Sequence, residues 1–451
     1  MTSDKSRRFG IHDVGLHLPS PRIDLDAIVE KRSRDNPSLQ RHLERAIRTT
    51  GQRAIRFPEA WEDSMTMAAE AARNVLQVTR GADPTSIRHL AVGTESGQDH
   101  SKSGSAWVQG MLSRAGIGIP RALSSFQVQH ACAGGTMALL SAGGLLSAAG
   151  RTGETALVAS ADVARYELAS TAEVTQGAGA AALFLGMAPR LLEIELSTVG
   201  YWSEDVDDFF RPLGSHIAQV KGSYSMKCYW DGLEAAFLDH CRRSGDDPSE
   251  RLRGTDLFAL HTPFRNMPQT ALQKLLEKQL GLDAEGSRNF LLERGFYEGV
   301  DPIAEIGNLY TASLWTVVAF LLANRYKTLG GDIVGKRMLL GSYGSGNTMI
   351  VMDARVSDGA PEVIERWNME HAFDSAREAS LEEYLQWARG PASPEEHDAR
   401  MEGVTLPRRA FFLAGIRKDG YREYRTAEER AAWLQEREAS RDLHRPLAVR
   451  G

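Results

Sequence analysis

The chain has 451 residues, of which 42% are hydrophobic and 25% are charged, and it contains three cysteines. Its 53 Lys and Arg against 59 Asp and Glu give a formal net charge of −6, without the basic surplus of a general nucleic-acid binder. Three cysteines exclude a disulfide scaffold and are typical of a reducing compartment, so we expect a cytoplasmic protein. We expect no secretion signal and no membrane span, because the N-terminus is charged and the apolar stretches at 137–149 and 311–323 are short.

Strand-like and helix-like segments alternate through the first half. The helical run 62–78 has acidic residues in its first turn, where the helix dipole favours them. Residues 88–96 form a short apolar run that ends in small polar residues, which predicts a buried strand leading to a functional loop. After it we expect a helix at 107–116, a strand at 125–132, a small-residue helix at 134–150 and strands at 155–162 and 179–187.

The second half repeats this order after an inserted segment at 195–255. We expect a strand at 256–264, an amphipathic helix at 267–280, a long buried helix at 307–326, and strands at 338–343 and 347–356 joined by a glycine-rich turn. Apolar strands alternating with helices predict an α/β fold whose sheet is covered on both faces. We therefore predict two related halves, residues 1–190 and 191–356, packed into one body. Residues 357–451, with the charged run 427–442, are expected to form a peripheral, mainly helical extension.

Cys132 is the first candidate for a nucleophile. It precedes a helix that starts at Gly134-Gly135, so its thiol would lie near the positive end of the helix dipole, which favours the thiolate. Free backbone N–H groups at such a position can also stabilise an oxyanion. The alternative is a buried structural cysteine that packs as a small hydrophobe. Cys228 and Cys241 have no such setting, and we expect them to be packing residues.

Three further polar residues stand where secondary-structure elements begin or end. His261 ends a strand, where it can bind a carbonyl or move a proton, or else is a hydrogen-bonded core residue. Asn308 precedes the long second-half helix, as a cap or as an amide donor to a thioester oxygen. Glu62 opens a helix beside Asp63, where it complements the dipole or acts as a general base. In the repeat, Asn308 is equivalent to Cys132, which favours a functional role for both.

Two other kinds of site are disfavoured. The glycine-rich run 341–347 joins two strands and lacks the GxxxxGK[ST] spacing, so it predicts a tight turn rather than a phosphate loop. The sequence contains neither CxxC nor HExxH, and His130 stands only two residues from Cys132. We therefore expect no metal site.

Eight segments in the same order resemble hydroxymethylglutaryl-CoA synthase, a condensing enzyme of thiolase fold. They are GTESGQDHSKSG (93–104), ACAGGTMAL (131–139), TQGAGAAALFLG (175–186), FRP (210–212), SMKCYWDGLEAAF (225–237), HTPF (261–264), GNLYTASL (307–314) and SYGSG (342–346). The resemblance extends over residues 8–430. It implies a thiolase-like α-β-α-β-α layered body, a homodimer, and no cofactor apart from CoA or phosphopantetheine thioesters as substrates.

The resemblance also implies a reaction and roles for matched residues. Cys132 matches the nucleophile that takes an acetyl group from a thioester such as acetyl-CoA. Glu62, in WEDSMTMA, matches the acid/base that deprotonates the acetyl methyl group. His261 and Asn308 match residues that bind an acetoacetyl thioester, and water then releases a 3-hydroxy-3-methylglutaryl thioester from the cysteine. Three further positions are expected to bind substrate: Asp162, Ser345 and Arg265.

The chain departs from the family at three positions. Ala133 stands where a Tyr usually follows the nucleophile, Arg265-Asn266 replaces a Lys that meets the CoA phosphates, and Lys221 replaces an acid. These changes affect carrier recognition more than the nucleophile. The acceptor is therefore either acetoacetyl-CoA, as in mevalonate supply, or an acyl group on an acyl carrier protein, as in polyketide β-branching.

Two readings outside this reaction stay open. The ACAG segment at 131–134 also resembles the nucleophile segment of ketoacyl synthase III-like enzymes, which condense with decarboxylation and need no additional Glu. The second interpretation is a non-catalytic protein that kept the fold and binds acyl carriers. Ala133 and Lys221 are the features that leave it open.

Overall fold

The structure, a computed structural model, describes residues 8–390, 393–401 and 403–435. The first half consists of β1 (Phe9–His17), β2 (Pro21–Asp24), α1 (Leu25–Asp35), α2 (Gln40–Thr50), β3 (Ala54–Arg56), α3 (Ser64–Val78), β4 (Ile87–Gly93), α4 (Gly104–Arg114), β5 (Ser124–Val128), α5 (Gly134–Ala149), β6 (Thr155–Ala164) and β7 (Gly177–Met187).

The second half begins with four short strands and a long helix. In chain order it consists of β8 (Leu192–Ile194), β9 (Gly200–Ser203), β10 (Phe209–Phe210), β11 (Gln219–Val220), α6 (Gly222–Ser244), α7 (Pro248–Arg253), β12 (Leu257–Leu260), α8 (Asn266–Leu280), α9 (Ala284–Glu293), α10 (Phe296–Val300), α11 (Ser313–Leu329), β13 (Arg337–Gly344) and β14 (Thr348–Val356). The C-terminal segment adds α12 (Ala360–Ile364), α13 (His371–Asp374), β15 (Arg377–Glu378), α14 (Leu381–Ala388), α15 (Pro394–Met401), β16 (Phe411–Ile416) and β17 (Arg422–Thr426).

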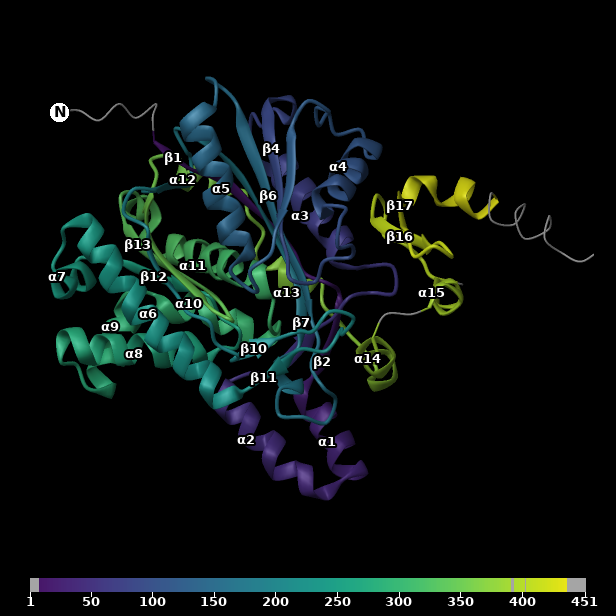
Figure 1. Ribbon diagram of the computed structural model, residues 1–451, viewed down its shortest axis with the longest axis horizontal. Coiled ribbons are helices and arrows are strands. Elements are labelled where there is room, and N and C mark those ends of the chain that lie inside the picture. The colour runs from purple at the N-terminus through teal and green to yellow at the C-terminus, as the bar shows by residue number, and fades with distance from the viewer. Residues whose placement is uncertain (1–7, 391–392, 402, 436–451) are drawn as a thin grey trace, which may run out of the picture.

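One mixed sheet joins the two halves (Figure 1). Its strand order is β12-β13-β14-β8-β1-β7-β6-β4-β5, and β9 pairs with β14 beside this path. In the first half β4 is parallel to β6, and β6 is antiparallel to β7. In the second half β12 is parallel to β13, and β13 is antiparallel to β14. This recurrence is the repeat that the sequence predicted.

The helices form the predicted layers. Alternate residues of β6 and β7 belong to two different hydrophobic clusters, because side chains along a strand point to opposite faces. One face packs against α3, and the other packs against α5. Helix α11 contacts β12 as well as β1 and β7, so it lies between the halves, while α6 packs against β13 and β14. The order of layers is helix, first-half part of the sheet, helix, second-half part of the sheet, helix.

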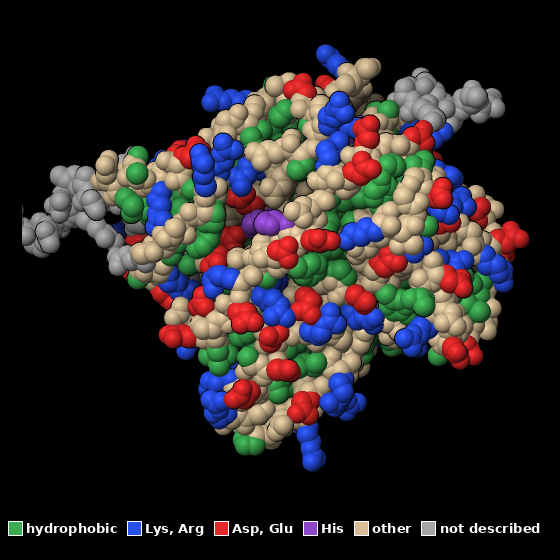
Figure 2. All heavy atoms as spheres, turned by 180° about the vertical axis from the view of Figure 1, so that it is seen from behind, with side chains coloured by type: hydrophobic (Ala, Val, Ile, Leu, Met, Phe, Trp, Pro, Cys, Tyr) green, Lys and Arg blue, Asp and Glu red, His purple; other side chains and the backbone are tan. Residues whose placement is uncertain are grey.

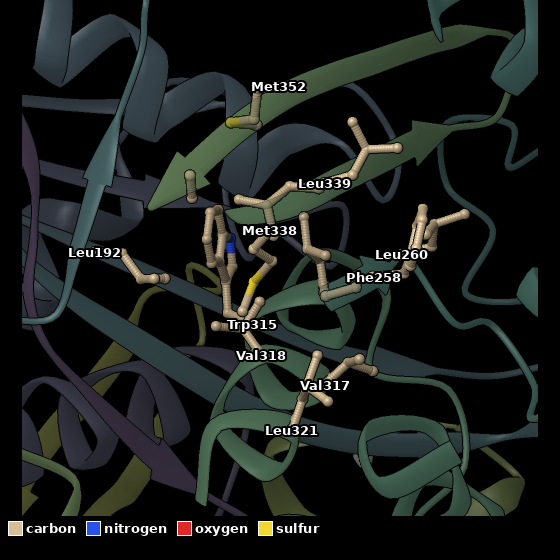
Figure 3. Close-up of a cluster of buried hydrophobic side chains, with 14 of the residues drawn as sticks. Leu192, Phe258, Leu260, Trp315, Val317, Val318, Leu321, Met338, Leu339 and Met352 are labelled. Atoms are coloured by element: carbon tan, nitrogen blue, oxygen red, sulfur yellow. The ribbon is translucent and has the colours of Figure 1, made fainter. Parts of the chain in front are cut away.

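The centre of the second half is a dense apolar core around α11. Figure 3 shows Trp315 and Val318 of α11 pointing toward Met338 of β13, with Phe258 of β12 beside them. Trp315 is fully buried. A buried Trp removes 150–250 Å² or so of mainly apolar surface from water, so this contact holds α11 against the sheet.

Helix α5 is more apolar than the sequence analysis expected. The helical stretch 131–149 is long and apolar enough to cross a bilayer, which corrects the expectation that the run at 137–149 falls short. A buried core helix meets the same criterion, and 56% of this stretch is buried within the protein, where α5 packs against β4 and β6.

On the face shown in Figure 2, basic and acidic side chains are interspersed.

The C-terminal segment is more than a peripheral helix. Its strands β16 and β17 form an antiparallel hairpin, and Phe411 and Tyr424 from it are buried in the same cluster as α3 and α4. Tyr424 also donates a hydrogen bond to Asp63, at 2.7 Å, just before α3. The hairpin is therefore part of the first half's outer layer, which corrects the expectation of a mainly helical extension. Residues 436–442 of the predicted charged run lie outside the described residues.

Candidate active site

Cys132 lies in the tight turn between β5 and α5. The preceding residue, Ala131, has a φ of 40°, in the left-handed region that L-residues rarely adopt. The start of α5 packs closely against β6, because a Cβ on Gly135 would come within 2.1 Å of the hydroxyl oxygen of Ser160. The turn is thus held by its glycines against β6, and it leaves the Cys132 side chain 7% exposed.

The carboxylate beside this thiol belongs to Glu95. Cys132 Sγ donates a hydrogen bond to Glu95 Oε1 at 3.2 Å, and Glu95 is only 8% exposed. Glu95 follows β4, and Cys132 follows β5; these neighbouring strands are parallel, so their carboxyl ends open at the same edge of the sheet. The topology therefore brings together two residues that are 37 positions apart.

Burial makes this pair unusual electrostatically. Burial and the charge of Asp162 raise the pKa of Glu95 to about 8, against a smaller opposing effect of Arg211. Burial and the nearby Glu95 charge raise the pKa of Cys132 well above its usual range. The thiolate expected from the helix dipole is therefore wrong for this structure, since desolvation and a neighbouring carboxylate outweigh the dipole. Glu95, in contrast, is poised to gain or lose a proton near neutral pH.

Asp162 holds the loop that carries Glu95. It is fully buried at the end of β6. Its Oδ1 accepts hydrogen bonds from the backbone N–H groups of Glu95 and Ser96, at 2.9 and 2.8 Å. Its Oδ2 accepts from the N–H of Thr311, at 3.0 Å, which joins the two halves. We predicted a substrate-binding role, but its hydrogen bonds go to protein groups, so Asp162 is a positioning residue.

Three aromatic side chains pack in one buried cluster with Cys132. The rings of Tyr166, Phe209 and Tyr310 meet edge to face, with centroids 5.8 to 6.4 Å apart, and they share a buried apolar cluster with Cys132. Asn308 fixes two of them: its Oδ1 accepts from the N–H of Tyr310 at 2.9 Å, and its Nδ2 donates to the hydroxyl of Tyr166 at 3.3 Å. Asn308 therefore lies against this aromatic cluster, and it is not the cap of α11, which is Ala312.

His261 follows β12, as the sequence predicted, and is buried. Its N–H donates to the carbonyl of Gly341 at 2.7 Å, and its carbonyl accepts from the Tyr229 hydroxyl at 2.7 Å. Burial lowers the pKa of His261 to about 3, so the ring is neutral at physiological pH. Its Nδ1 atom is buried and has no partner among the described residues. A buried ring nitrogen of this kind can hydrogen-bond an incoming ligand.

Glu62 is not the carboxylate at the cysteine. Its Oε1 lies 2.7 Å from His17 Nε2, and its Oε2 accepts the N–H of Glu59 at 2.9 Å. The structure places Glu95 beside Cys132 instead. A signal for Glu95 was present, because it stands in the small polar loop GTES after a predicted buried strand.

Two other predicted residues have different surroundings. The guanidinium of Arg265, at the start of α8, forms an ion pair with Asp301 at 2.8 Å and donates to Gln269 at 2.7 Å. Ser345 is half-buried in the turn between β13 and β14. Sequence reasoning missed the three aromatic side chains, although Tyr310 stands within the segment 307–314 and Phe209 directly precedes the segment 210–212.

Two family models and several curated relatives match the chain. Residues 7–189 and 300–424 match the families described as the N-terminal and C-terminal parts of hydroxymethylglutaryl-coenzyme A synthase. The hydroxymethylglutaryl-CoA synthase of Enterococcus faecalis is 29% identical over 83% of this chain and 90% of its own length. The polyketide biosynthesis 3-hydroxy-3-methylglutaryl-ACP synthase PksG of Bacillus subtilis is 27% identical over 74% of this chain and 78% of its own.

Solved structures show the same likeness. MvaS in complex with 3-hydroxy-3-methylglutaryl coenzyme A has a TM-score of 0.78 and 30% identity, and the match covers 93% of this chain and 99% of that one. The curacin pathway HMG synthase in complex with a holo donor acyl carrier protein has a TM-score of 0.78 at 22% identity, over 93% and 100% of the two chains.

Proposed function

Because the chain belongs to the hydroxymethylglutaryl-coenzyme A synthase family and has its thiolase-like fold, we propose that it makes a 3-hydroxy-3-methylglutaryl thioester. The substrates are an acetyl thioester and an acetoacetyl thioester. The observation that carries the proposal is the contact between Cys132 Sγ and Glu95 Oε1, at 3.2 Å, where Cys132 shares a buried cluster with three aromatic rings. A nucleophile and a proton acceptor lie there within hydrogen-bonding distance, away from bulk water.

The first step is acylation of Cys132. Glu95 accepts the thiol proton, Sγ attacks the acetyl carbonyl, and the carrier leaves as a thiol that takes up that proton. The raised pKa of Cys132 means that the thiolate forms only as the substrate reacts. The aromatic rings of Tyr166, Phe209 and Tyr310 then surround the small acetyl group with apolar surface.

The second step forms the carbon–carbon bond. The Glu95 carboxylate removes a proton from the methyl group of acetyl-Cys132, and the resulting enolate carbon attacks the ketone of the acetoacetyl thioester. The ketone oxygen becomes an alkoxide and takes the proton from Glu95. A pKa of about 8 suits both halves of this exchange, because a group near the working pH both accepts and returns a proton. The neutral ring of His261 and the Asn308 amide are suited to binding the acceptor's carbonyl oxygens.

The last step is hydrolysis. Water attacks the Cys132 thioester, the bond from carbon to Sγ breaks, and the thiol regains a proton. The product leaves with a new carboxylate at the position where it was attached to the enzyme and with its other thioester intact.

The carrier on the acceptor is either CoA or an acyl carrier protein, since both present a phosphopantetheine arm. MvaS is described in complex with 3-hydroxy-3-methylglutaryl coenzyme A, and the relative PksG is named a 3-hydroxy-3-methylglutaryl-ACP synthase. One feature favours the carrier protein as a second candidate. The guanidinium of Arg265, at the position expected to meet the CoA phosphates, is already bound by Asp301 and Gln269.

Activity measurements on two matched carboxyl-to-amide variants test the proposal. Wild-type protein with acetyl and acetoacetyl thioesters on each carrier should yield the 3-hydroxy-3-methylglutaryl thioester by mass spectrometry. Glu95→Gln should lower kcat by about 10²–10⁴-fold, the usual contribution of a general base. Glu62→Gln is the control and should retain most activity, because its hydrogen bonds go to His17 and Glu59. The opposite ranking of the two variants would refute the assignment of Glu95.

A further inference from the structure

Two arginines, Arg165 and Arg211, lie in segments that the fold brings together next to the aromatic cluster around Cys132. Arg165 directly precedes Tyr166, and Arg211 follows Phe209 by two positions. The Tyr166 and Phe209 rings are 6.3 Å apart. The carbonyl of Arg165 also accepts the N–H of Ala218, at 3.2 Å, so the chain after Arg211 runs along the chain at Arg165.

Neither guanidinium has an acidic partner among the described residues. The Nε atom of Arg165 is buried without a hydrogen-bond partner, and its guanidinium lies 5.0 Å from the centre of the Trp387 ring. Arg211 is half-buried, with no ion pair in the described part of the chain. Unpaired cations that are withdrawn from water are costly, so such a pair indicates a site for an anion.

Other basic side chains also lie near Arg165. Arg400 of α15 and Arg422 of β17 lie near it, together with Arg211 and the exposed His216. Arg400 and Arg422 are neutralised by Glu396 and Asp63, at 2.5 and 3.1 Å. Burial, and then these arginines, lower the pKa of Arg165 to about 10, so the guanidinium stays charged at neutral pH but is destabilised by its neighbours.

We propose that Arg165 and Arg211 form an anion site that binds the carboxylate of the reaction product. This inference rests on the proposed function, in which hydrolysis creates a carboxylate at Cys132. That carboxylate is formed beside two acidic groups, Glu95 and Asp162, and it repels either of them when they are ionised. Two guanidinium groups near the aromatic cluster offset this repulsion, and a guanidinium can bind a carboxylate through two hydrogen bonds.

The location favours the product carboxylate over a phosphate of the carrier. Arg211 is near enough to Glu95 for its charge to oppose the upward shift of that group's pKa, which burial dominates. Arg165 is adjacent to Tyr166, whose ring shares a cluster with Cys132. A phosphopantetheine arm carries its phosphate and its thioester sulfur at opposite ends. The sulfur has to reach Cys132, so the phosphate lies away from it.

Binding of two matched thioesters tests the site without turnover. Glutaryl-pantetheine and pentanoyl-pantetheine differ only in a terminal carboxylate against a methyl group, and Cys132→Ala prevents their transfer to the enzyme. In this background we expect the glutaryl compound to bind about tenfold more tightly or better, as for a charge-assisted hydrogen bond. Adding Arg165→Gln and Arg211→Gln together should abolish the preference for the glutaryl compound. Binding of pentanoyl-pantetheine should stay unchanged, which also shows that the binding site is still folded.

Arg41→Gln is the control for loss of a positive charge, because Arg41 is exposed on α2, and it should keep the preference. Equal binding of the two thioesters in the starting protein, or a preference that survives the double substitution, would overturn the proposal. The proposed function is tested separately by turnover, so its failure would appear as absence of product and not as absence of carboxylate preference.

Discussion

The substitution Glu95→Gln should change how stability depends on pH. In the folded protein the pKa of Glu95 is raised from 4.5 to about 8, chiefly by burial. In the unfolded chain the group is exposed and ionises near its ordinary value. Between these two pKa values the folded protein binds one more proton than the unfolded chain, so the free energy of unfolding falls as pH rises.

The size of this effect follows from the shift. The pKa of Glu95 shifts from 4.5 to about 8, and each pKa unit corresponds to about 1.4 kcal/mol. The free energy of unfolding of the wild-type protein should therefore fall by about 5 kcal/mol between pH 4.5 and pH 8. Glutamine has no proton to release, so this loss should be absent from Glu95→Gln. Groups that do not interact with Glu95 titrate equally in both proteins and cancel in the difference, whereas Cys132 and Asp162 are coupled to Glu95.

Urea denaturation at pH 5, 6, 7, 8 and 9 measures this difference. The stability of Glu95→Gln relative to wild type should rise steadily from pH 5 to pH 8 and then level off. If the two proteins lost stability in parallel over this range, Glu95 would titrate near its ordinary value. The argument from burial, and with it the assignment of Glu95 as a proton acceptor near neutral pH, would then be refuted.

Three further outcomes can be measured on the same protein. Asp162→Asn should lower the free energy of urea unfolding by about 3 kcal/mol and slow turnover, because the new amide group faces backbone N–H donors. Trp315→Ala should cost about 3–5 kcal/mol in the same assay, as for other large deletions in a packed core, and a loss below about 1 kcal/mol would contradict the packing of α11. His261, whose pKa is lowered to about 3, should remain neutral from pH 5 to pH 9 in nitrogen-15 NMR spectra, and an imidazolium signal at pH 5 would contradict its burial.

The architecture was predictable from local sequence because both halves carry the same pattern. Apolar runs such as 155–162 and 338–343 are buried on both faces, so their strands stand out, and the helices between them leave few alternative topologies. The hairpin β16–β17 was missed. The apolar run FFLAGI of β16 is itself typical of a buried strand, but it lies in a charge-rich region and was overlooked. The charged sequence of β17 gives no such signal, and the burial of Phe411 and Tyr424 depends on contacts with α3 and α4.

The candidate site was only partly predictable. Cys132 and His261 were found because each stands at the end of a strand, before a turn. Glu95 was overlooked in favour of Glu62 because both are acidic residues near small polar neighbours, so the local sequence does not distinguish them. What separates them is the parallel pairing of β4 with β5, which brings Glu95 and not Glu62 to the thiol.

The ionisation of the site was least predictable. A cysteine before a helix suggested a thiolate, whereas burial and the Glu95 carboxylate raise the pKa of Cys132. Desolvation depends on every element that covers a group, so it follows from the assembled fold and not from sequence position.

The central claim is that Cys132 carries the acyl group, and intact-mass spectrometry of the protein after brief exposure to an acetyl thioester tests it most directly. Wild-type protein should gain one acetyl group, which peptide mapping should place on Cys132, and Cys132→Ala should gain none. Condensation products formed without any acetylated Cys132, or by Cys132→Ala at the wild-type rate, would contradict the account.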